Sequence, residues 1–397
     1  MKKLITVLSL LSLSFLSQFE SSYSQFDPVV TLVDNPSPGY LLFDWPNYAP
    51  FKLLDNYGDF IQKNDLYKVS NFFYPLANGK FAILDENKAI IFNEDIVKVD
   101  TVPVPSNLII DFHDFISLAN GRYLFLCNEQ IQVDMSGIAE GGQKDAIIFN
   151  NVLLETDRSG TIYWIWSAFN HLNILDATSA VDLTQKTIDF CHINSLFETP
   201  DGDILVSIRH FDEVALIDKS TGNFKWRLGG SKSKRNEFSF ANDSIDGFTG
   251  FSHQHTATML SNGNILLFDN GNLKPNQFCR AVEYSLNTVS KIATKVWEYY
   301  PKPNLVIPSE GSAYRLPNGN TLIGFSQKYI CEVRPDNNMA LKVELQDWFP
   351  FYRAYKVYNH LDYVSLNINS TSEYNFNNTT FQTGIRINVK HLDGTVG

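Results

Sequence analysis

A short phrase that repeats along the chain constrains its fold more than any other feature of the sequence. The phrase is an Asn-Gly or Asp-Gly turn followed at once by an apolar run, as in residues 120–126. It begins at five positions, Asn78, Asn120, Asp201, Asn262 and Asn318. Such turns join the strands of β-hairpins, and helical periodicity is nearly absent from the chain. The repeat therefore predicts an all-β protein.

The spacing of the phrase indicates the architecture. Successive copies lie roughly 40 to 80 residues apart. This spacing equals or exceeds the usual length of a four-stranded propeller blade. Tryptophans stand near the ends of three units, in the segments 160–166, 222–226 and 293–299. The longer units hold polar insertions at 135–145 and 231–250. Five blade-like units fit between about Phe72 and Gln346 on this pattern.

A sixth blade would combine the two ends of the propeller. The N-terminal segments 39–43 and 55–61 would supply strands, and the segment 352–357 would pair with them. Joining the first and last strands in one sheet closes the ring and leaves no open edge. We therefore predict a six-bladed β-propeller over residues 26–358, with seven blades as the alternative count.

The two ends of the chain differ from the body. Lys2 and Lys3 precede the apolar stretch 4–16, and a polar segment follows up to Gln25. Such a stretch is too short to span a bilayer comfortably and is typical of a cleaved export signal. We predict a signal peptide at 1–25, a periplasmic or secreted mature protein, and no membrane span. Residues 359–397, dense in Asn, Thr and Ser, predict a β-rich or disordered C-terminal extension.

The charge and the cysteines limit the partners and the cross-links. The formal net charge is −11, and no basic stripe offsets it, which argues against nucleic acid as a partner. An anionic small molecule is not excluded, because the field inside a cleft can oppose the net charge. The four cysteines show no metal-ligand spacing, and the sequence leaves both disulfides and buried free thiols open. They are Cys127, Cys191, Cys279 and Cys331.

Histidines recur at one place in successive units. His113, His192 and the pair His253 and His255 all stand just before the turn-and-strand phrase. In a propeller this place is the innermost strand, which lines the central channel. Arg209 follows the apolar run of the unit that carries His192 and can enter the same space. We predict one axial site. The other histidines lack this placement and are assigned to structural or surface roles; they are His171, His210, His360 and His391.

A cluster of imidazoles suits either a metal ion or an anion. Asp111 and Asp114 could support a metal ion. An arginine in such a site repels a cation, whereas guanidinium and imidazole N–H groups match the oxygens of a tetrahedral oxyanion. We therefore favour an anion site and predict no bound metal.

Several short stretches resemble the bacterial arylsulfotransferases that need no nucleotide sulfate donor. They occur in order over residues 111–357, at 111–114, 192–195, 207–209, 226–230, 254–257, 268–271, 280–284 and 310–312. The resemblance implies a six-bladed propeller. It also implies that a sulfuryl group moves from an aryl sulfate to a phenol by a ping-pong route through a sulfo-histidine, with no cofactor. The N-terminal β-domain that supports dimerisation in that family has no evident counterpart, so the oligomeric state stays open.

The resemblance also implies roles for particular residues. His255 would be the nucleophile, and His113, His192 and Arg209 would hold the sulfuryl oxygens and complete the catalytic set. Residues within or beside the same stretches are assigned to substrate binding; they are His253, Asn194, Asp269 and Asn270. His253 stands two residues before His255, and residues two apart on a strand point to the same face. The sequence therefore leaves His253 as an alternative nucleophile.

Two other functions fit the same pocket. One is a non-catalytic propeller that captures a sulfated or carboxylated ligand such as a glycan, and the other is a metal-dependent hydrolase. A sulfatase of the formylglycine type is disfavoured, because the chain has no Cys-x-Pro-x-Arg stretch.

Overall fold

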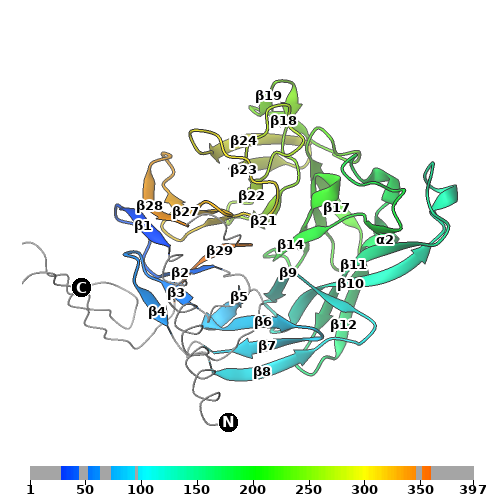
Figure 1. Ribbon diagram of the computed structural model, residues 1–397, viewed down its shortest axis with the longest axis horizontal. Coiled ribbons are helices and arrows are strands. Elements are labelled where there is room, and N and C mark those ends of the chain that lie inside the picture. The colour runs from blue at the N-terminus through cyan, green and yellow to red at the C-terminus, as the bar shows by residue number, and fades with distance from the viewer. Residues whose placement is uncertain (1–27, 44–51, 63–72, 94–96, 346–350, 359–397) are drawn as a thin grey trace, which may run out of the picture.

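Six sheets of four or five strands lie around a central axis in the computed structural model, and Figure 1 shows their arrangement. The structure describes residues 28–43, 52–62, 73–93, 97–345 and 351–358. The predicted signal peptide and C-terminal extension lie outside these residues. In each of these sheets the strands are ordered from one nearest the axis to one at the rim. The prediction of an all-β, six-bladed propeller is confirmed.

The first three blades are given from the centre outward. Blade 1 consists of β29 (Ala354–Val357), β2 (Tyr40–Phe43), β3 (Lys52–Leu54) and β4 (Phe60–Gln62). Blade 2 consists of β5 (Phe73–Pro75), β6 (Phe81–Asp85), β7 (Lys88–Phe92) and β8 (Lys98–Pro103). Blade 3 consists of β9 (Ile109–Ser117), β10 (Tyr123–Val133), β11 (Ala146–Thr156) and β12 (Ile162–Ser167), with β13 (Thr187–Asp189) pairing parallel to β11.

The other three blades follow the same pattern. Blade 4 consists of β14 (Ile193–Glu198), β15 (Ile204–Ile208), β16 (Glu213–Ile217) and β17 (Phe224–Gly229). Blade 5 consists of β21 (His255–Met259), β22 (Ile265–Asp269), β23 (Arg280–Asn287) and β24 (Ile292–Tyr299), with β18 (Ser239–Ala241) added at its rim. Blade 6 consists of β25 (Ser312–Arg315), β26 (Thr321–Phe325), β27 (Tyr329–Val333) and β28 (Met339–Glu344), with β1 (Val29–Val33) added outside it.

In the described part of the chain, helices are few and short. They are η2 (Ala77–Gly79), η3 (Met135–Gly137), α2 (Ala168–His171), η4 (Ile174–Asp176) and η5 (Arg209–Phe211). The insertion at 231–250 forms β18 and a small ribbon of β19 (Ser244–Ile245) with β20 (Phe248–Thr249). Across the described ranges, no helix is long and apolar enough to cross a membrane.

Hydrophobic packing between neighbouring blades explains why the strands are apolar on both faces. In β2, Leu41 and Phe43 pack in a cluster with blade 6, while Tyr40 and Leu42 pack in a cluster with blade 2. Successive side chains of a strand point to opposite faces of its sheet. Because a neighbouring blade covers each face, all four residues of β2 are buried. Six such clusters among the described residues fill the six interfaces around the ring.

The ring closes by pairing the two ends of the propeller. β29 pairs antiparallel with β2, from Tyr40 with Val357 to Phe43 with Ala354, as the sequence predicts. One part of that prediction is wrong: most of the segment 55–61 is a turn between β3 and β4. The Asp55 carboxylate accepts hydrogen bonds from the N–H groups of Tyr57 (2.8 Å) and Asp59 (2.9 Å), and such Asx bonds favour a turn over a strand.

A buried ion pair near the axis ties this closure to the opposite side of the ring. Arg353, just before β29, makes two contacts of 3.0 Å with the carboxylate of Asp114 in β9. The guanidinium also donates to the carbonyl oxygen of Asn194 at 2.7 Å, and the Asp114 carboxylate accepts from the N–H of Leu196 at 2.7 Å. Three blades therefore meet at one charged group. Asp114, considered above as a partner for a metal ion, is instead bound to Arg353.

Replacing Asp114 should weaken the whole fold. In Asp114→Asn the Arg353 charge stays buried without its carboxylate, and breaking a buried pair in this way costs about 3–5 kcal/mol. Equilibrium urea denaturation of the variant and the wild type measures the difference. Asp145→Asn is a matched control, since Asp145 pairs with Lys186 on the exposed surface, and its unfolding midpoint should not move. An Asp114→Asn protein as stable as the wild type would contradict the account.

The four cysteines are buried free thiols, which answers the question that the sequence leaves open. Burial raises the pKa of each thiol, that of Cys279 to about 12. The reactive thiolate is therefore scarce at neutral pH.

We expect a chromogenic thiol reagent to react very slowly with the native protein and to titrate four thiols after unfolding, because burial both shields the sulfurs and suppresses ionisation. The reaction is followed with and without denaturant, under non-reducing conditions. Fewer than four thiols in the unfolded protein would reveal a disulfide and contradict the structure.

Candidate active site

Four side chains from three blades line one cavity of about 670 Å³ near the axis. His113 lies in β9, His192 directly precedes β14, Arg209 begins η5, and His255 is the first residue of β21. The sequence places the three histidines on innermost strands, and the structure brings them together with Arg209.

His255 is held in one tautomer by Asn270. Its Nδ1 lies 2.7 Å from the Asn270 side-chain oxygen. The Asn270 side-chain N–H₂ donates to the carbonyl oxygens of Ile307 (2.8 Å) and Glu310 (2.9 Å), which fixes the orientation of the amide. The amide oxygen can only accept, so Nδ1 of His255 carries the hydrogen and Nε2 keeps its lone pair. The Glu310 backbone N–H donates a hydrogen bond to this Nε2 at 3.3 Å, which agrees with an Nε2 that carries no hydrogen.

Burial keeps the His255 ring neutral. Only 2% of the residue is exposed. Burial lowers the pKa of His255 well below its ordinary value, and the nearby charge of Arg209 lowers it further. A neutral imidazole whose Nε2 carries no hydrogen is a nucleophile, and only the long hydrogen bond from the Glu310 N–H engages its lone pair.

His113 has the opposite electrostatic environment. Its Nδ1 is hydrogen-bonded to the Asp111 carboxylate, whose other oxygen accepts from the side-chain amides of Asn128 (2.8 Å) and Asn151 (3.3 Å). Burial opposes protonation of His113, but the charge and hydrogen bond of Asp111 outweigh it and raise the pKa of His113. The ring of His113 is therefore suited to carry and return a proton.

His192 is held in a strained backbone conformation. Its φ of +52° lies in the left-handed region, which β-strand residues rarely adopt. The His192 carbonyl oxygen accepts a hydrogen bond from the Arg209 N–H at 3.1 Å. The Cys191 carbonyl oxygen accepts one from the His210 N–H, also at 3.1 Å. The His192 ring bonds through Nδ1 to Asp189 and packs against His113 at 4.6 Å between centroids.

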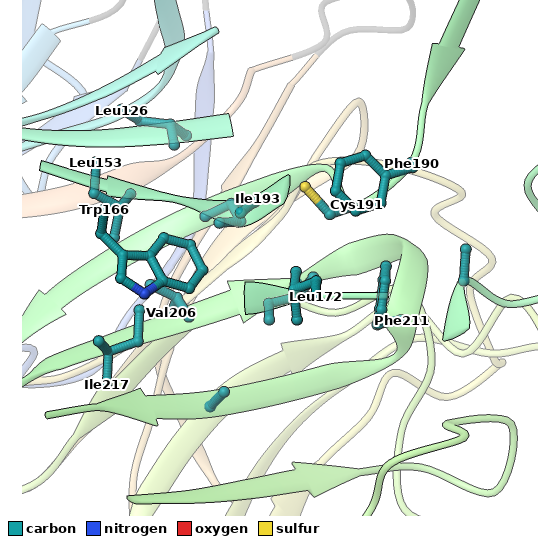
Figure 2. Close-up of a cluster of buried hydrophobic side chains, with 14 of the residues drawn as sticks. Leu126, Leu153, Trp166, Leu172, Phe190, Cys191, Ile193, Val206, Phe211 and Ile217 are labelled. Carbon is teal, nitrogen blue, oxygen red and sulfur yellow. The ribbon is translucent and has the colours of Figure 1, made fainter. Parts of the chain in front are cut away.

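Packing beneath the site fixes the two segments that carry His192 and Arg209. Figure 2 shows Phe190, Cys191 and Ile193 from one segment and Phe211 from the other in a shared buried cluster. The rings of Phe190 and Phe211 meet at 6.1 Å between centroids. Phe190, Cys191, Ile193 and Phe211 thus face the core, while His192 and Arg209 line the cavity.

Arg209 supplies the positive charge at the cavity wall. It is half-buried, and its Nη2 donates to the carbonyl oxygen of Pro308 at 3.2 Å. Burial lowers the pKa of Arg209, but a guanidinium stays charged at neutral pH. Glu310 also lines the cavity, where burial raises the pKa of its carboxyl and the Ser326 hydroxyl hydrogen-bonds to it. Arg209 therefore offers an oxyanion a positive partner at the cavity wall, beside the Asp111 and Asp189 carboxylates that pair with His113 and His192.

The residues assigned to substrate binding lie behind the cavity surface. Asn194 is buried, and its side-chain N–H₂ donates to the Gln254 carbonyl oxygen at 2.8 Å. Asp269 is buried in ion pairs with Lys274 (2.5 Å) and Arg280 (2.9 Å). Neither residue lines the cavity, whereas Asn270 acts on it through His255.

The structure distinguishes His253 from His255. His253 precedes β21 with a φ of +52°, so the alternation of a regular strand does not apply between the two residues. Its Nδ1 accepts from the Asn272 side chain at 3.1 Å. Burial and the charge of Arg209 lower the pKa of His253 to about 3. Of the two histidines, His255 lines the cavity.

Among the cavity residues that were not predicted from the sequence, Asp189 and Tyr352 contact the histidines of the site. Asp189 stands three residues before His192, much as Asp111 stands two before His113, and that parallel could have revealed it. Tyr352 comes from the far end of the chain, and its ring lies 5.4 Å from His113 and 6.0 Å from His255 between centroids. No local pattern marks it.

The tautomer and charge of His255 can be measured by nitrogen NMR of labelled imidazoles. We expect the His255 signals to remain those of a neutral ring with hydrogen on Nδ1 from about pH 8 to about pH 6, where a free histidine gains its proton. Loss of these signals in His255→Asn assigns them. A ring that protonates near the ordinary pKa, or that carries hydrogen on Nε2, would contradict this geometry.

Comparisons with known proteins bear on the family and the fold. A family model described as Arylsulfotransferase (ASST) matches residues 17–346. A search of curated proteins found no match. A solved structure of a protein of unknown function from Bacteroides caccae is similar, with a TM-score of 0.51 and 11% identity over 81% of this chain and 99% of that chain. This likeness concerns the fold alone.

Two further solved structures are more distant. One is a catalytically inactive virginiamycin B lyase from Staphylococcus aureus with quinupristin, with a TM-score of 0.39 and 10% identity over 81% of this chain and 88% of that chain. The other is the Pan2 WD40 domain of Neurospora crassa, with a TM-score of 0.40 and 10% identity over 83% and 81% of the two chains. The family match extends over most of the sequence, and the chain therefore belongs to the arylsulfotransferase family.

Proposed function

We propose that this protein transfers a sulfuryl group from an aryl sulfate to a phenolic acceptor through a covalent intermediate on His255. The observation that carries the proposal is the bond from His255 Nδ1–H to Asn270 (2.7 Å), which leaves the Nε2 lone pair in a cavity lined by Arg209 and two further imidazoles. Membership of the family supports aryl sulfotransfer in general.

In the first half-reaction, Nε2 of His255 attacks the sulfur and the sulfur–oxygen bond to the aryl group breaks. The departing phenoxide takes a proton from His113, whose ring Asp111 orients and stabilises in the protonated form. Arg209 and His192 neutralise the sulfuryl oxygens throughout. Asn270 accepts a hydrogen bond from Nδ1–H as the ring becomes positively charged.

In the second half-reaction, the acceptor phenol gives its proton to His113 and its oxygen attacks the same sulfur. The sulfur–nitrogen bond breaks, and its electron pair returns to Nε2 of His255. The enzyme thus regains its starting protonation state, and the donor supplies the sulfuryl group without a cofactor.

Residues 1–25 lie outside the described structure, and we retain periplasmic or secreted localisation as a proposal based on them. A basic start followed by a short apolar stretch supports it.

A chromogenic aryl sulfate with excess phenol tests the transfer. The wild type should release the chromophore and sulfate the phenol, and His255→Asn should lower turnover by about 10³-fold or more because the nucleophile is lost. Arg209→Ala should lower it by about 10²- to 10³-fold through lost charge stabilisation. Product formation is followed by absorbance and by mass spectrometry of the sulfated phenol.

His171→Asn is the matched control, since His171 lies away from the cavity and bonds through Nδ1 to the Ser167 carbonyl oxygen at 2.8 Å. It should turn over like the wild type. Full activity in His255→Asn would refute the mechanism. Donor binding without transfer would instead indicate a ligand-capturing propeller, and release of free sulfate would indicate a hydrolase.

A further inference from the structure

Asp189, His192 and His210 form a second chemically active group at the cavity wall. One nitrogen of each imidazole and one carboxylate oxygen lie within 4.8 Å of one another. Around a tetrahedral zinc ion, with bonds of about 2.0–2.1 Å, such atoms lie about 3.3 Å apart. Small side-chain movements would therefore close the group around an ion. All three residues are half-buried, so an ion can reach them from solvent.

His210 has the second hydrogen bond typical of a metal-ligating histidine. Its Nδ1 lies 2.8 Å from the backbone carbonyl oxygen of Asp189, and because a carbonyl only accepts, Nδ1 carries the hydrogen. Nε2 therefore has a free lone pair. Ligating histidines usually fix their tautomer and orientation in this way. The His192 ring packs against His210 at 4.7 Å between centroids.

The backbone beneath the group is rigid. The His210 carbonyl oxygen accepts a hydrogen bond from the Thr178 N–H at 2.8 Å. The His210 N–H donates to the Cys191 carbonyl oxygen at 3.1 Å. Phe190 and Phe211, next to Asp189 and His210 in sequence, pack in the cluster of Figure 2. Ligands placed on fixed backbone lose little freedom when they bind an ion.

The surrounding charges set the expected affinity. Asp189 contributes one negative charge, and Asp111 is close enough to interact with it electrostatically. Arg209 interacts with both Asp189 and His210, and its positive charge opposes a cation. We therefore expect micromolar binding, weaker than that of a closed four-ligand structural site.

We propose that Asp189, His192 and His210 bind a divalent transition-metal ion, with Zn²⁺ as the best fit. Two imidazoles and one carboxylate match the ligand preference of this ion, whereas Mg²⁺ prefers oxygen ligands. Three protein ligands leave a fourth position for water or an anion oxygen. Because His192 also belongs to the proposed sulfuryl site, zinc and an aryl sulfate alter each other's affinity, although metal binding itself does not require sulfuryl transfer.

The test measures Zn²⁺ binding to metal-free full-length protein by competition with a chromophoric chelator. We expect one equivalent to bind and an excess of Mg²⁺ not to displace it. His210→Asn should weaken the binding by at least about tenfold, since a ligand is lost. The Asn side chain can still donate an N–H to the Asp189 carbonyl oxygen, so the local backbone should persist. Asp189→Asn should weaken the binding likewise.

His171→Asn is the matched control, because His171 makes the same type of Nδ1 bond to a carbonyl oxygen away from the cavity. It should bind zinc as the wild type does. X-ray absorption at the zinc edge should show two imidazoles among nitrogen and oxygen ligands. Absence of binding, or binding that His210→Asn leaves unchanged, would overturn the proposal. Because this readout involves no sulfuryl donor, its failure is distinct from failure of the proposed function.

Discussion

The ion pair between Arg353 and Asp114 connects the closure of the ring to the site. Arg353 directly precedes the last strand of the propeller, and its guanidinium reaches blades 3 and 4 through Asp114 and Asn194. The preceding residue, Tyr352, donates its hydroxyl to the same Asn194 carbonyl oxygen at 2.9 Å and places its ring beside His113 and His255. The C-terminal strand therefore does more than seal the fold. The segment that leads into it contributes Tyr352 to the cavity wall, so weaker pairing of the ring's ends would disturb the site as well as the stability.

The chemistry at the axis depends on departures from regular β-structure. Left-handed backbone conformations occur at His192 and Glu310, which line the cavity, and at His253 and Thr256, within two residues of His255. These conformations are costly for residues other than glycine and persist where surrounding contacts impose them. Here buried packing and backbone hydrogen bonds supply those contacts. A propeller of regular blades thus provides a rigid frame in which the inner ends of a few strands turn side chains toward one point.

Much of the fold follows from local patterns in the sequence. The turn phrases, the apolar strands and the tryptophans of the outer strands are enough to predict six blades and the meeting of both ends. His113, His192 and His255 could be placed on innermost strands because each precedes its turn phrase. The hairpin at Asp55–Asp59 was missed, because its aspartate-based turn lies between strands of only three residues.

The remaining features depend on contacts that no local pattern encodes. Arg353 and Asp114 stand 239 positions apart, and Tyr352 meets the histidines only when the ring has closed. Asn194 and Asp269 lie in stretches that resemble the family, yet their side chains support the backbone and a charged cluster behind the cavity. Asn270, one residue further on, sets the tautomer of His255. Proximity in sequence to a site does not decide which side chain faces it.

The central claim is that His255 carries the sulfuryl group between donor and acceptor. Mass spectrometry of peptides after incubation with an aryl sulfate alone, with no phenol present, tests it most directly. The account predicts a gain of one sulfuryl group on the peptide that contains His255, located on that residue by fragmentation and discharged when a phenol is added. No adduct in a protein that catalyses transfer, or an adduct on another residue, would contradict it.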